Sequence, residues 1–222
     1  MKMCFWRISR RDFPVILAEG IFFDNLGTQV LEYCQEAGNN FSLRQVGRLD
    51  KDTSGIVLFA KNRPAAARLW KQRENGRLKK TYYVLVHGIF SEREGVIDLP
   101  MKQEGKRMCV CMDGGQRAVT RYCTEWAGTH KGSPVSLLSC HLDTGRTHQI
   151  RVHMAASGHP VVGDPVYGIK DEAKRLHLHA GKLSFFQPFT GEYIEKTSEF
   201  CGESTFTWPC NTYSAENKQA DK

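Results

Sequence analysis

The sequence predicts a single α+β domain in which many short strands are interleaved with two or three short helices. Three observations lead to this prediction: apolar runs of strand length recur, helical spacing of apolar residues is confined to a few short segments, and no Pro/Gly/Ser-rich linker or internal repeat interrupts residues 12–200. A chain of 222 residues can also bury a sizeable core. We therefore expect one domain over residues 1–205, followed by a polar, frayed tail over 206–222.

The first half of the chain contains two helix patterns and two strand patterns. Residues 25–38 carry apolar side chains at helical spacing and end at a glycine, which predicts a short helix. The apolar run 55–60 is typical of a buried strand. Residues 62–76 predict a second helix, because Asn62 can cap its start and a glycine follows its end. The aromatic and β-branched residues of 80–88 then predict another strand.

The second half is richer in strands. Residues 91–117 are polar and contain glycine, and they are expected to form a hairpin or a long loop. Strand character resumes in 118–126 and 133–142, and the stretch 143–158 contains a helix pattern that ends at a glycine. After a Gly/Pro loop, the alternating residues 175–185 predict a last strand.

The composition favours a polyanionic partner such as nucleic acid. The chain has 31 Lys and Arg against 24 Asp and Glu, a formal charge of +7 and a pI near 9.0. Basic residues recur along the whole chain, so the fold would have to assemble any binding surface. A solvated surface without a partner is the alternative.

The cysteines and the N-terminus indicate the compartment. Eight cysteines without a tight framework fit reduced intracellular thiols. No apolar run approaches the roughly 20 residues of a membrane-spanning helix, and the N-terminus lacks the apolar core of a secretory signal. We expect an intracellular, cytoplasmic protein with no membrane contact, while four basic residues before the first acid, Asp12, leave a mitochondrial address open.

Two carboxylates stand in a polar connection just before the buried strand 55–60. Asp50 and Asp52 belong to the segment "RLDKDTSG", and functional residues favour such short connections on a rigid sheet. Asp before a Ser/Gly pair also commonly bonds backbone N–H groups in a turn. Taken alone, this segment favours the turn.

A second segment, "GRTHQIRVH", concentrates basic side chains. Eight positions contain four of them, namely Arg146, His148, Arg151 and His153. Such a cluster suits the clamping of phosphate or the pairing with a carboxylate, although ordinary solvated helices also carry such clusters.

A third segment, "KKTYY", places two tyrosines side by side. Tyr82 and Tyr83 point to opposite faces of one strand, so one can face the core while the other faces a cleft. Simple packing of both rings is the alternative.

These three segments closely resemble the signatures of the RluA-type pseudouridine synthases. "RLDKDTSG" matches the first motif of the family, "KTY" at 80–82 matches its strand, and "TGRTHQIRVH" with "GHPVVGDPVYG" matches its third motif within 144–168. Order and spacing are kept from about residue 40 to 186. Three ordered motifs are far more specific than one.

The resemblance implies the pseudouridine synthase fold, with an extended mixed, mainly antiparallel sheet, flanking helices and loops, and a central catalytic cleft. It also implies an isomerase that converts uridine to pseudouridine in structured RNA (rRNA or tRNA) without a cofactor or a metal. No S4-like RNA-binding domain precedes the matched region, so the choice of RNA is expected to come from the catalytic domain or from partners. A monomer is expected.

The resemblance assigns the catalytic roles to three residues. Asp50 would start the reaction, either as a nucleophile or as a base that removes a sugar proton. A buried carboxylate resists ionisation, and Arg151 is the expected paired cation. Tyr82 would stack against the flipped uracil and is a candidate for removing the C5 proton. Asp52 would then be a turn residue, and Tyr83 would face the core.

Four further residues are expected to contact RNA: Arg48, Lys80, Arg146 and His148. Arg48 lies two residues before the acid, where it can fill the space left by the flipped base or touch a phosphate. A plain surface salt bridge is the alternative for Arg48.

Two other functions stay open. One is a catalytically silent RNA-binding module. The other is a zinc-dependent hydrolase or deaminase that uses Cys109, Cys111, His177 and His179, whose i, i+2 spacing puts each pair on one face of a strand. The chain contains no CxxC, HExxH or phosphate-cradling Gly motif, so neither a metal site nor a nucleotide cofactor is expected.

Overall fold

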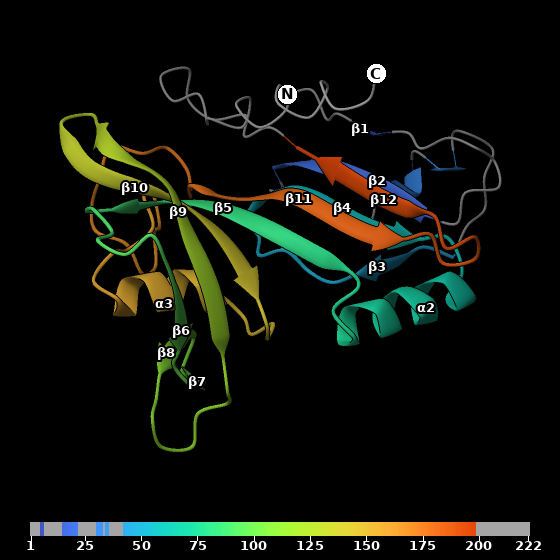
Figure 1. Cartoon of the computed structure of the whole chain (residues 1–222), viewed down its shortest axis with the longest axis horizontal. Coiled ribbons are helices and arrows are strands. Elements are labelled where there is room, and N and C mark those ends of the chain that lie inside the picture. Colours follow the sequence, from blue (N-terminus) through green and yellow to red (C-terminus); the bar gives the residue numbers. More distant parts are fainter. Residues whose placement is uncertain (1–4, 7–14, 22–29, 33, 36–41, 199–222) are drawn as a thin grey trace, which may run out of the picture.

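The computed structural model describes residues 5–6, 15–21, 30–32, 34–35 and 42–198. Its main element is a ten-stranded sheet whose central path runs β1-β2-β4-β11-β5-β10-β9-β6, with β3 beside β4 and β12 beside β11 (Figure 1). Every pairing in this sheet is antiparallel except that of β4 with β11. The predicted mainly antiparallel α+β architecture is confirmed.

The strands of the sheet are β1 (Phe5–Trp6), β2 (Val15–Ile21), β3 (Arg44–Val46), β4 (Ser54–Ala60), β5 (Lys79–His87), β6 (Glu94–Asp98), β9 (Val119–His130), β10 (Ser133–Leu142), β11 (Leu178–Phe186) and β12 (Tyr193–Thr197). A separate hairpin is formed by β7 (Met101–Glu104) and β8 (Arg107–Val110). The two described helices with complete bounds are α2 (Arg63–Glu74) and α3 (Gln149–Ala156).

Both helices lie on the same face of the sheet, α2 towards one end and α3 towards the other (Figure 1). The alternation of β5 shows which of its side chains point to this face. Tyr82 and Val84 pack on the side of α3, while Tyr83 packs in a separate cluster on the opposite face. Because Lys80 has the same parity as Tyr82, both side chains belong to the face between the two helices. The sheet thus provides a floor and the two helices provide walls.

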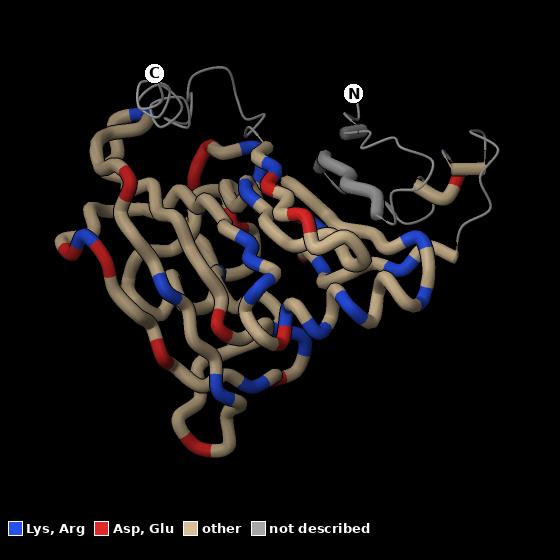
Figure 2. Tube along the Cα trace, turned by 45° about the vertical axis from the view of Figure 1, so that its right-hand side comes forward, with Lys and Arg blue, Asp and Glu red and all other residues tan. Residues whose placement is uncertain are grey.

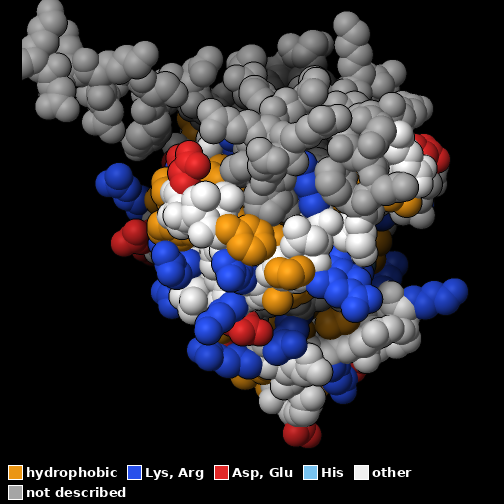
Figure 3. All heavy atoms as spheres, turned by 90° about the vertical axis from the view of Figure 1, so that its right-hand side faces the viewer, with side chains coloured by type: hydrophobic (Ala, Val, Ile, Leu, Met, Phe, Trp, Pro, Cys, Tyr) orange, Lys and Arg blue, Asp and Glu red, His pale blue; other side chains and the backbone are white. Residues whose placement is uncertain are grey.

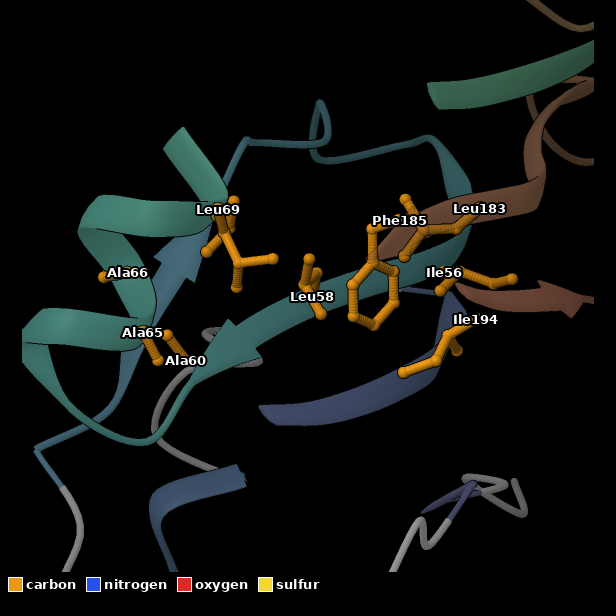
Figure 4. Packing of buried hydrophobic residues seen from close by; sticks show 10 residues of the cluster. Ile56, Leu58, Ala60, Ala65, Ala66, Leu69, Leu183, Phe185 and Ile194 are labelled. Atoms are coloured by element: carbon orange, nitrogen blue, oxygen red, sulfur yellow. The ribbon is translucent and has the colours of Figure 1, made fainter. Parts of the chain in front are cut away.

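The position of α2 follows from its cap and its small buried face. The side chain of Asn62 accepts a hydrogen bond from the Ala65 N–H at 2.9 Å, as predicted for the cap. Ala65 and Leu69 then pack against Leu58 and Phe185 of the sheet (Figure 4). Leu69 is fully buried, so Leu69→Ala would cost about 2–5 kcal/mol and loosen the helix.

A glycine allows β4 and β11 to approach closely at their parallel pairing. A Cβ on Gly55 would lie 2.3 Å from the carbonyl oxygen of Ala180, and the φ of Gly55 is +116°. No other residue fits this position without displacing backbone. The glycine therefore fixes where β4 begins, and with it the preceding loop.

The strand and helix predictions are confirmed over most of the described chain. Residues 91–117 do contain a hairpin, but β6 joins the edge of the main sheet by pairing with β9. The expected clean alternation of 175–185 is interrupted by a register shift between Ala180 and Lys182. Of the predicted helix 25–38, residues 30–32 and 34–35 are helical and the others lie outside the described residues, as does the expected tail 206–222. No described helix is long and apolar enough to cross a membrane.

Candidate active site

A cavity of about 110 Å³ opens on the sheet face between the two helices. Its walls come from the loop after β3, the end of α2, the first half of β5, the end of β10, the loop before α3 with the first turn of that helix, and the start of β11. The lining residues are Arg48, Leu49, Asp50, Thr53, Arg73, Tyr82, Leu142, Gly145, Arg146, Thr147, His148, Gln149, Ile150 and Leu178. The structure thus brings together four segments that are far apart in the sequence, and three of them carry the predicted site residues.

Asp50 stands on the loop between β3 and β4, where its carbonyl oxygen accepts a hydrogen bond from the Thr53 N–H at 3.0 Å. Its side chain is half-buried, and no described Lys, Arg or His nitrogen lies within 4.0 Å of the carboxylate. Beside larger effects of burial, the negative charge of Asp50 favours the protonated forms of Tyr82, His148 and Arg151, although burial still leaves the pKa of His148 lowered. The carboxylate is therefore electrostatically central to the cavity and not consumed by an internal ion pair.

Tyr82 contributes an aromatic face to the cavity. Burial, followed by the charge of Asp50, raises the pKa of the phenol, although the positive charge of Arg73 opposes the shift. The phenol is therefore protonated throughout the neutral pH range. Tyr83, its neighbour, packs against the cluster that contains Leu85 on the other face of the sheet, as predicted.

Arg151 does not pair with Asp50, and this prediction was wrong. Its guanidinium donates two hydrogen bonds of 2.7 Å each to the two carboxylate oxygens of Asp164. Both side chains are buried, at 2% and 0% exposure. Burial alone would lower the pKa of Arg151, but Asp164 and then Asp50 raise it. Asp50 and Arg151 attract each other through space, while the direct partner of the arginine comes from the Gly/Pro loop after α3.

The pair with Arg151 also fixes the loop that follows α3. The Asp164 carboxylate accepts hydrogen bonds from the backbone N–H groups of Val166 and Tyr167 at 2.8 and 3.0 Å. Burial would raise the pKa of Asp164, but the bonds from Arg151 and these two amides hold it below its usual range. One buried arginine thereby orients the loop that carries Tyr167.

Tyr167 connects that loop to His148 at the cavity wall. Its hydroxyl accepts from the Met108 N–H at 3.1 Å and lies 2.9 Å from Nδ1 of His148, so its own proton can go to the imidazole. This arrangement leaves the Nε2 proton on the neutral ring. Burial lowers the pKa of His148. His148 has a φ of +55°, an uncommon conformation for a non-glycine residue that recurs at functional sites.

The predicted basic cluster divides between the cavity and the core. Arg146 and His148 line the cavity, but His153 is fully buried. Nε2 of His153 donates to the Leu99 carbonyl at 3.0 Å, and its Nδ1 lies 2.9 Å from the Thr120 hydroxyl. Of the four, only Arg146 and His148 are placed to bind phosphate, while Arg151 and His153 hold α3 in place.

Gln149, whose role the sequence did not indicate, holds the cavity loop against β9. Its oxygen accepts from the Arg146 N–H at 3.0 Å and from the Thr144 hydroxyl at 2.9 Å. Its nitrogen donates to the Val119 carbonyl at 2.9 Å and the Thr120 hydroxyl at 3.1 Å. All hydrogen-bonding groups of this buried amide serve to place the loop.

A second, larger hollow of about 670 Å³ extends the first along the sheet face. It shares Arg48, Arg73 and Tyr82 with the small cavity and adds Lys79 and Lys80 from the start of β5. Burial, aided by the positive charge of Arg73, lowers the pKa of Lys80 to about 8. All four predicted RNA-contacting residues line one hollow or the other. We call the larger one the basic groove.

Arg73 is a second cavity residue that the sequence motifs did not indicate. It lies near the end of α2 and lines both hollows, and its charge acts on the pKa values of Lys80 and Tyr82. The available signal was its place on a short helix that leads directly into the "KKTY" strand. Helical spacing alone does not show which exposed arginine faces a cleft.

The cysteines and histidines considered for zinc lie apart from this site. The thiols of Cys109 and Cys111 are within hydrogen-bond range of the carbonyls of Lys102 and Asp113. In the described part of the chain, no group of three or more His, Cys, Asp or Glu side chains could hold a metal ion.

Comparisons with known proteins agree on one family. The family model described as RNA pseudouridylate synthase matches residues 24–156. An uncharacterised RNA pseudouridine synthase of Bacillus subtilis (YlyB) is 39% identical over 80% of this chain and 60% of its own length. The dual-specificity RNA pseudouridine synthase RluA of Vibrio cholerae is 35% identical over 75% of this chain and 66% of its own length.

A solved structure gives the same result for the fold. Human RNA pseudouridylate synthase domain containing 1 superimposes with a TM-score of 0.75 and 27% identity, covering 90% of this chain and 84% of that chain. The chain spans 59%, 60% and 62% of three of the curated Bacillus subtilis relatives that it matches. An uncharacterised RNA pseudouridine synthase of Zymomonas mobilis is 42% identical, with 70% of its length covered. The chain therefore belongs to the RNA pseudouridylate synthase family and resembles its RluA-type members.

Proposed function

We propose that this protein is an RNA pseudouridine synthase that isomerises uridine in structured RNA, either rRNA or tRNA, by flipping the base and without a cofactor. One observation carries the proposal: Asp50, free of an ion pair among the described residues, lines a small cavity together with the aromatic ring of Tyr82 and the cations of Arg48 and Arg146. A carboxylate, an aromatic face and phosphate-binding cations are what a flipped nucleotide requires.

Asp50 starts the reaction in this proposal. Isomerisation breaks the bond between N1 of uracil and C1′ of the ribose, turns the base, and forms a bond from C5 to C1′; C5 loses its proton and N1 gains one. The carboxylate either attacks a carbon atom as a nucleophile or removes a proton from the sugar. The accessible position of Asp50 suits both routes. Arg151 supports the carboxylate through space and acts as a positioning residue through Asp164.

Tyr82 supports the flipped uracil by stacking, which is worth roughly 1–3 kcal/mol per base. Extruding a stacked nucleotide costs a few kcal/mol, so a stacking partner offsets part of that cost. The raised pKa of Tyr82 keeps its oxygen protonated. This argues for the aromatic face as its main contribution and against a phenolate that removes the C5 proton.

RNA contacts follow from the cations that line the two hollows. Arg48 faces both, Lys80 lies in the basic groove, and Arg146 and His148 line the small cavity. A relative of Zymomonas mobilis that is 38% identical is named ribosomal large subunit pseudouridine synthase D, which supports rRNA as one substrate class. We further propose that residues 1–205 form the catalytic unit, that it acts as an intracellular monomer, and that its address is cytoplasmic or mitochondrial.

The decisive experiment measures pseudouridine directly. The purified protein is incubated with unmodified transcripts of rRNA and tRNA in the presence of a chelator, and pseudouridines are mapped in parallel in cellular RNA with and without the gene. We expect one or a few uridines to be converted in both tests. Binding of RNA without conversion would favour a silent binding module, and conversion that returns only on adding zinc would contradict the carboxylate mechanism.

A further inference from the structure

We propose that Trp70 and Arg73 of α2 form a binding station for a nucleotide that flanks the flipped uridine, with the arginine on its phosphate and the indole against its base. We call these two residues the α2 station. The proposal rests on the proposed function, since it adds a contact for the same RNA. It extends the substrate surface from the cavity and the basic groove onto the outer side of α2.

The charge of the chain is concentrated where the station lies. Residues 61–80 contain eight Lys and Arg and one Glu, which equals the +7 excess of the whole chain. This segment comprises α2, the turn after it and the start of β5. Lys and Arg recur along this part of the trace (Figure 2), and the α2 end of the molecule shows them around apolar side chains (Figure 3). Such a concentration attracts a polyanion.

Arg73 reaches from this charged helix to the mouth of the cavity. A Cβ on Gly145 would lie 2.6 Å from Nη2 of Arg73, and a Cβ on Gly47 would lie 4.0 Å from its Nη1. The guanidinium therefore lies near the loop after β3 and the loop before α3, where the small cavity and the basic groove meet. A phosphate next to a nucleotide in the cavity would pass within its reach.

The guanidinium of Arg73 is also free to bind a ligand. Among the described residues it has no hydrogen-bond or ion-pair partner, whereas Arg151 bonds Asp164, Arg121 bonds Asp143 and Arg146 bonds the Arg117 carbonyl. An arginine fork without an internal acceptor can bind a phosphate without first breaking a bond in the protein.

Trp70 provides the aromatic surface beside this arginine. Its side chain is 41% exposed, and its ring centroid lies 5.0 Å from the guanidinium carbon of Arg73. Residues three apart lie side by side on a helix, so the two groups form one surface. The cation–π contact holds the guanidinium in place, and the exposed part of the indole can stack with any base.

The helix that carries the station is fixed to the sheet. The amide side chain of Gln72 donates to the Phe186 carbonyl at 2.7 Å and accepts from the Phe186 N–H at 2.8 Å. This two-point bond orients the residues on both sides of Gln72. A station held in this way loses little freedom when RNA binds.

The first test measures binding of a fluorescein-labelled twelve-nucleotide oligouridylate to the full chain at several salt concentrations. Arg73→Gln should weaken binding and make the negative slope of log K against log salt shallower by about 0.7, the value for one phosphate contact on a single strand. Trp70→Ala should weaken binding by about 5- to 150-fold, equivalent to roughly 1–3 kcal/mol, with the slope unchanged. Trp70→Phe keeps an aromatic ring and should retain most of the affinity.

Lys71→Gln is the matched control. It removes the same charge from the same helix, but position 71 lies about 200° around the helix from Arg73. Its affinity should fall only slightly, because it weakens the general attraction of the charged segment, and its salt slope should match that of the unaltered chain. If Arg73→Gln and Trp70→Ala behave like Lys71→Gln, the station is overturned.

The second test measures pseudouridine formation in the transcript identified by the mapping experiment. Loss of a contact that is equal in the ground and transition states raises KM and leaves kcat unchanged. We expect this pattern for Trp70→Ala and Arg73→Gln. A fall in kcat at unchanged KM would contradict a binding role. An unaltered chain that forms no pseudouridine would overturn the proposed function itself, whereas an active chain with silent variants would overturn only the station.

Discussion

Two arginines on the helices beside the cavity differ in burial and in pairing, and only Arg73 lines the cavity. Arg151 on α3 is buried and gives two hydrogen bonds to Asp164. Arg73 on α2 is exposed and has no polar partner among the described residues. A buried cation without its anion would cost several kcal/mol, so the α3 charge must be neutralised inside the fold. An exposed cation remains solvated, so it needs no internal anion and can bind a ligand.

The two helices that form the walls of the site have different roles. The α3 wall positions neighbouring loops and strands, because Arg151 and Gln149 are already bonded to Asp164 and to β9. The α2 wall carries an exposed cation, Arg73, and an exposed aromatic ring, Trp70, and Lys80 lies beside it in the basic groove. Asp50 lies in the cavity between the two helices and has no ion-pair partner among the described residues. Substitutions on the α3 wall should therefore affect stability, and substitutions on the α2 wall should affect binding.

The largest effect is expected at the acid between the walls. Asp50→Asn should reduce pseudouridine formation by about 10²–10⁴-fold or more, because the carboxylate starts the chemistry. Unfolding temperature and RNA affinity should stay near their original values, since no ion pair of the described residues is lost. The measurement is single-turnover formation of pseudouridine, with Asp52→Asn as the mild control. An inactive Asp52→Asn beside an active Asp50→Asn would show that the wrong carboxylate has been chosen.

On the α3 wall, Arg151→Met should destabilise the fold by about 3–5 kcal/mol, because it leaves the Asp164 carboxylate buried without its cation. Urea denaturation measures this loss. The pair lowers the folded pKa of Asp164, so its contribution is present above the unfolded value of about 3.9 and is lost as the pH falls through the folded value. Arg151→Met should therefore show a weaker loss of stability on acidification than the original chain.

The matched variant Arg151→Met with Asp164→Asn removes both charges. It should recover part of the stability, because no ion is then left unpaired in the core. If Arg151→Met alone left the stability unchanged, it would contradict the role of the α3 wall in stability.

On the open wall, RNA affinity should depend on the protonation of Lys80. Its pKa of about 8 means that it is largely charged at pH 7 and neutral at pH 9. If its charge binds RNA, affinity should fall by about tenfold over this range, since about a tenth of the side chains stay protonated at pH 9. Fluorescence anisotropy at constant ionic strength measures this change. Lys80→Gln should bind more weakly at pH 7 and lose the pH dependence; a persisting dependence would point to another group.

The smallest effect is expected at Thr53, whose hydroxyl oxygen is buried at the cavity without a described partner. An unsatisfied buried hydroxyl costs about 1–3 kcal/mol, so Thr53→Val should unfold at the same or a higher temperature. If substrate satisfies the hydroxyl, kcat/KM should still fall several-fold. Thermal unfolding and initial rates test the two effects separately. A less stable Thr53→Val protein with normal kcat/KM would show that the hydroxyl serves the fold.

Much of the fold could be read from local patterns. The run 55–60 is apolar throughout and becomes the fully buried β4, and Asn62 caps α2 as expected. These features depend on side chains that are near one another in the chain. The interruption of β11 near Gly181 was missed because a register shift depends on the partner strand.

For the site, the motifs named Asp50, Tyr82 and the basic residues before α3, and the structure places them at one cavity. The motifs did not name the partner of Arg151. An arginine on a helix can reach several acids, and Asp164 was selected only because the Gly/Pro loop after α3 folds back over the buried guanidinium. The sequence did not indicate Arg73, because the sheet on which α2 packs decides which face of the helix points to the cavity. Local sequence determined which elements form and which residues can react. The tertiary structure decided which charges are neutralised inside and which stay exposed, because burial and partner distance are properties of the packed chain.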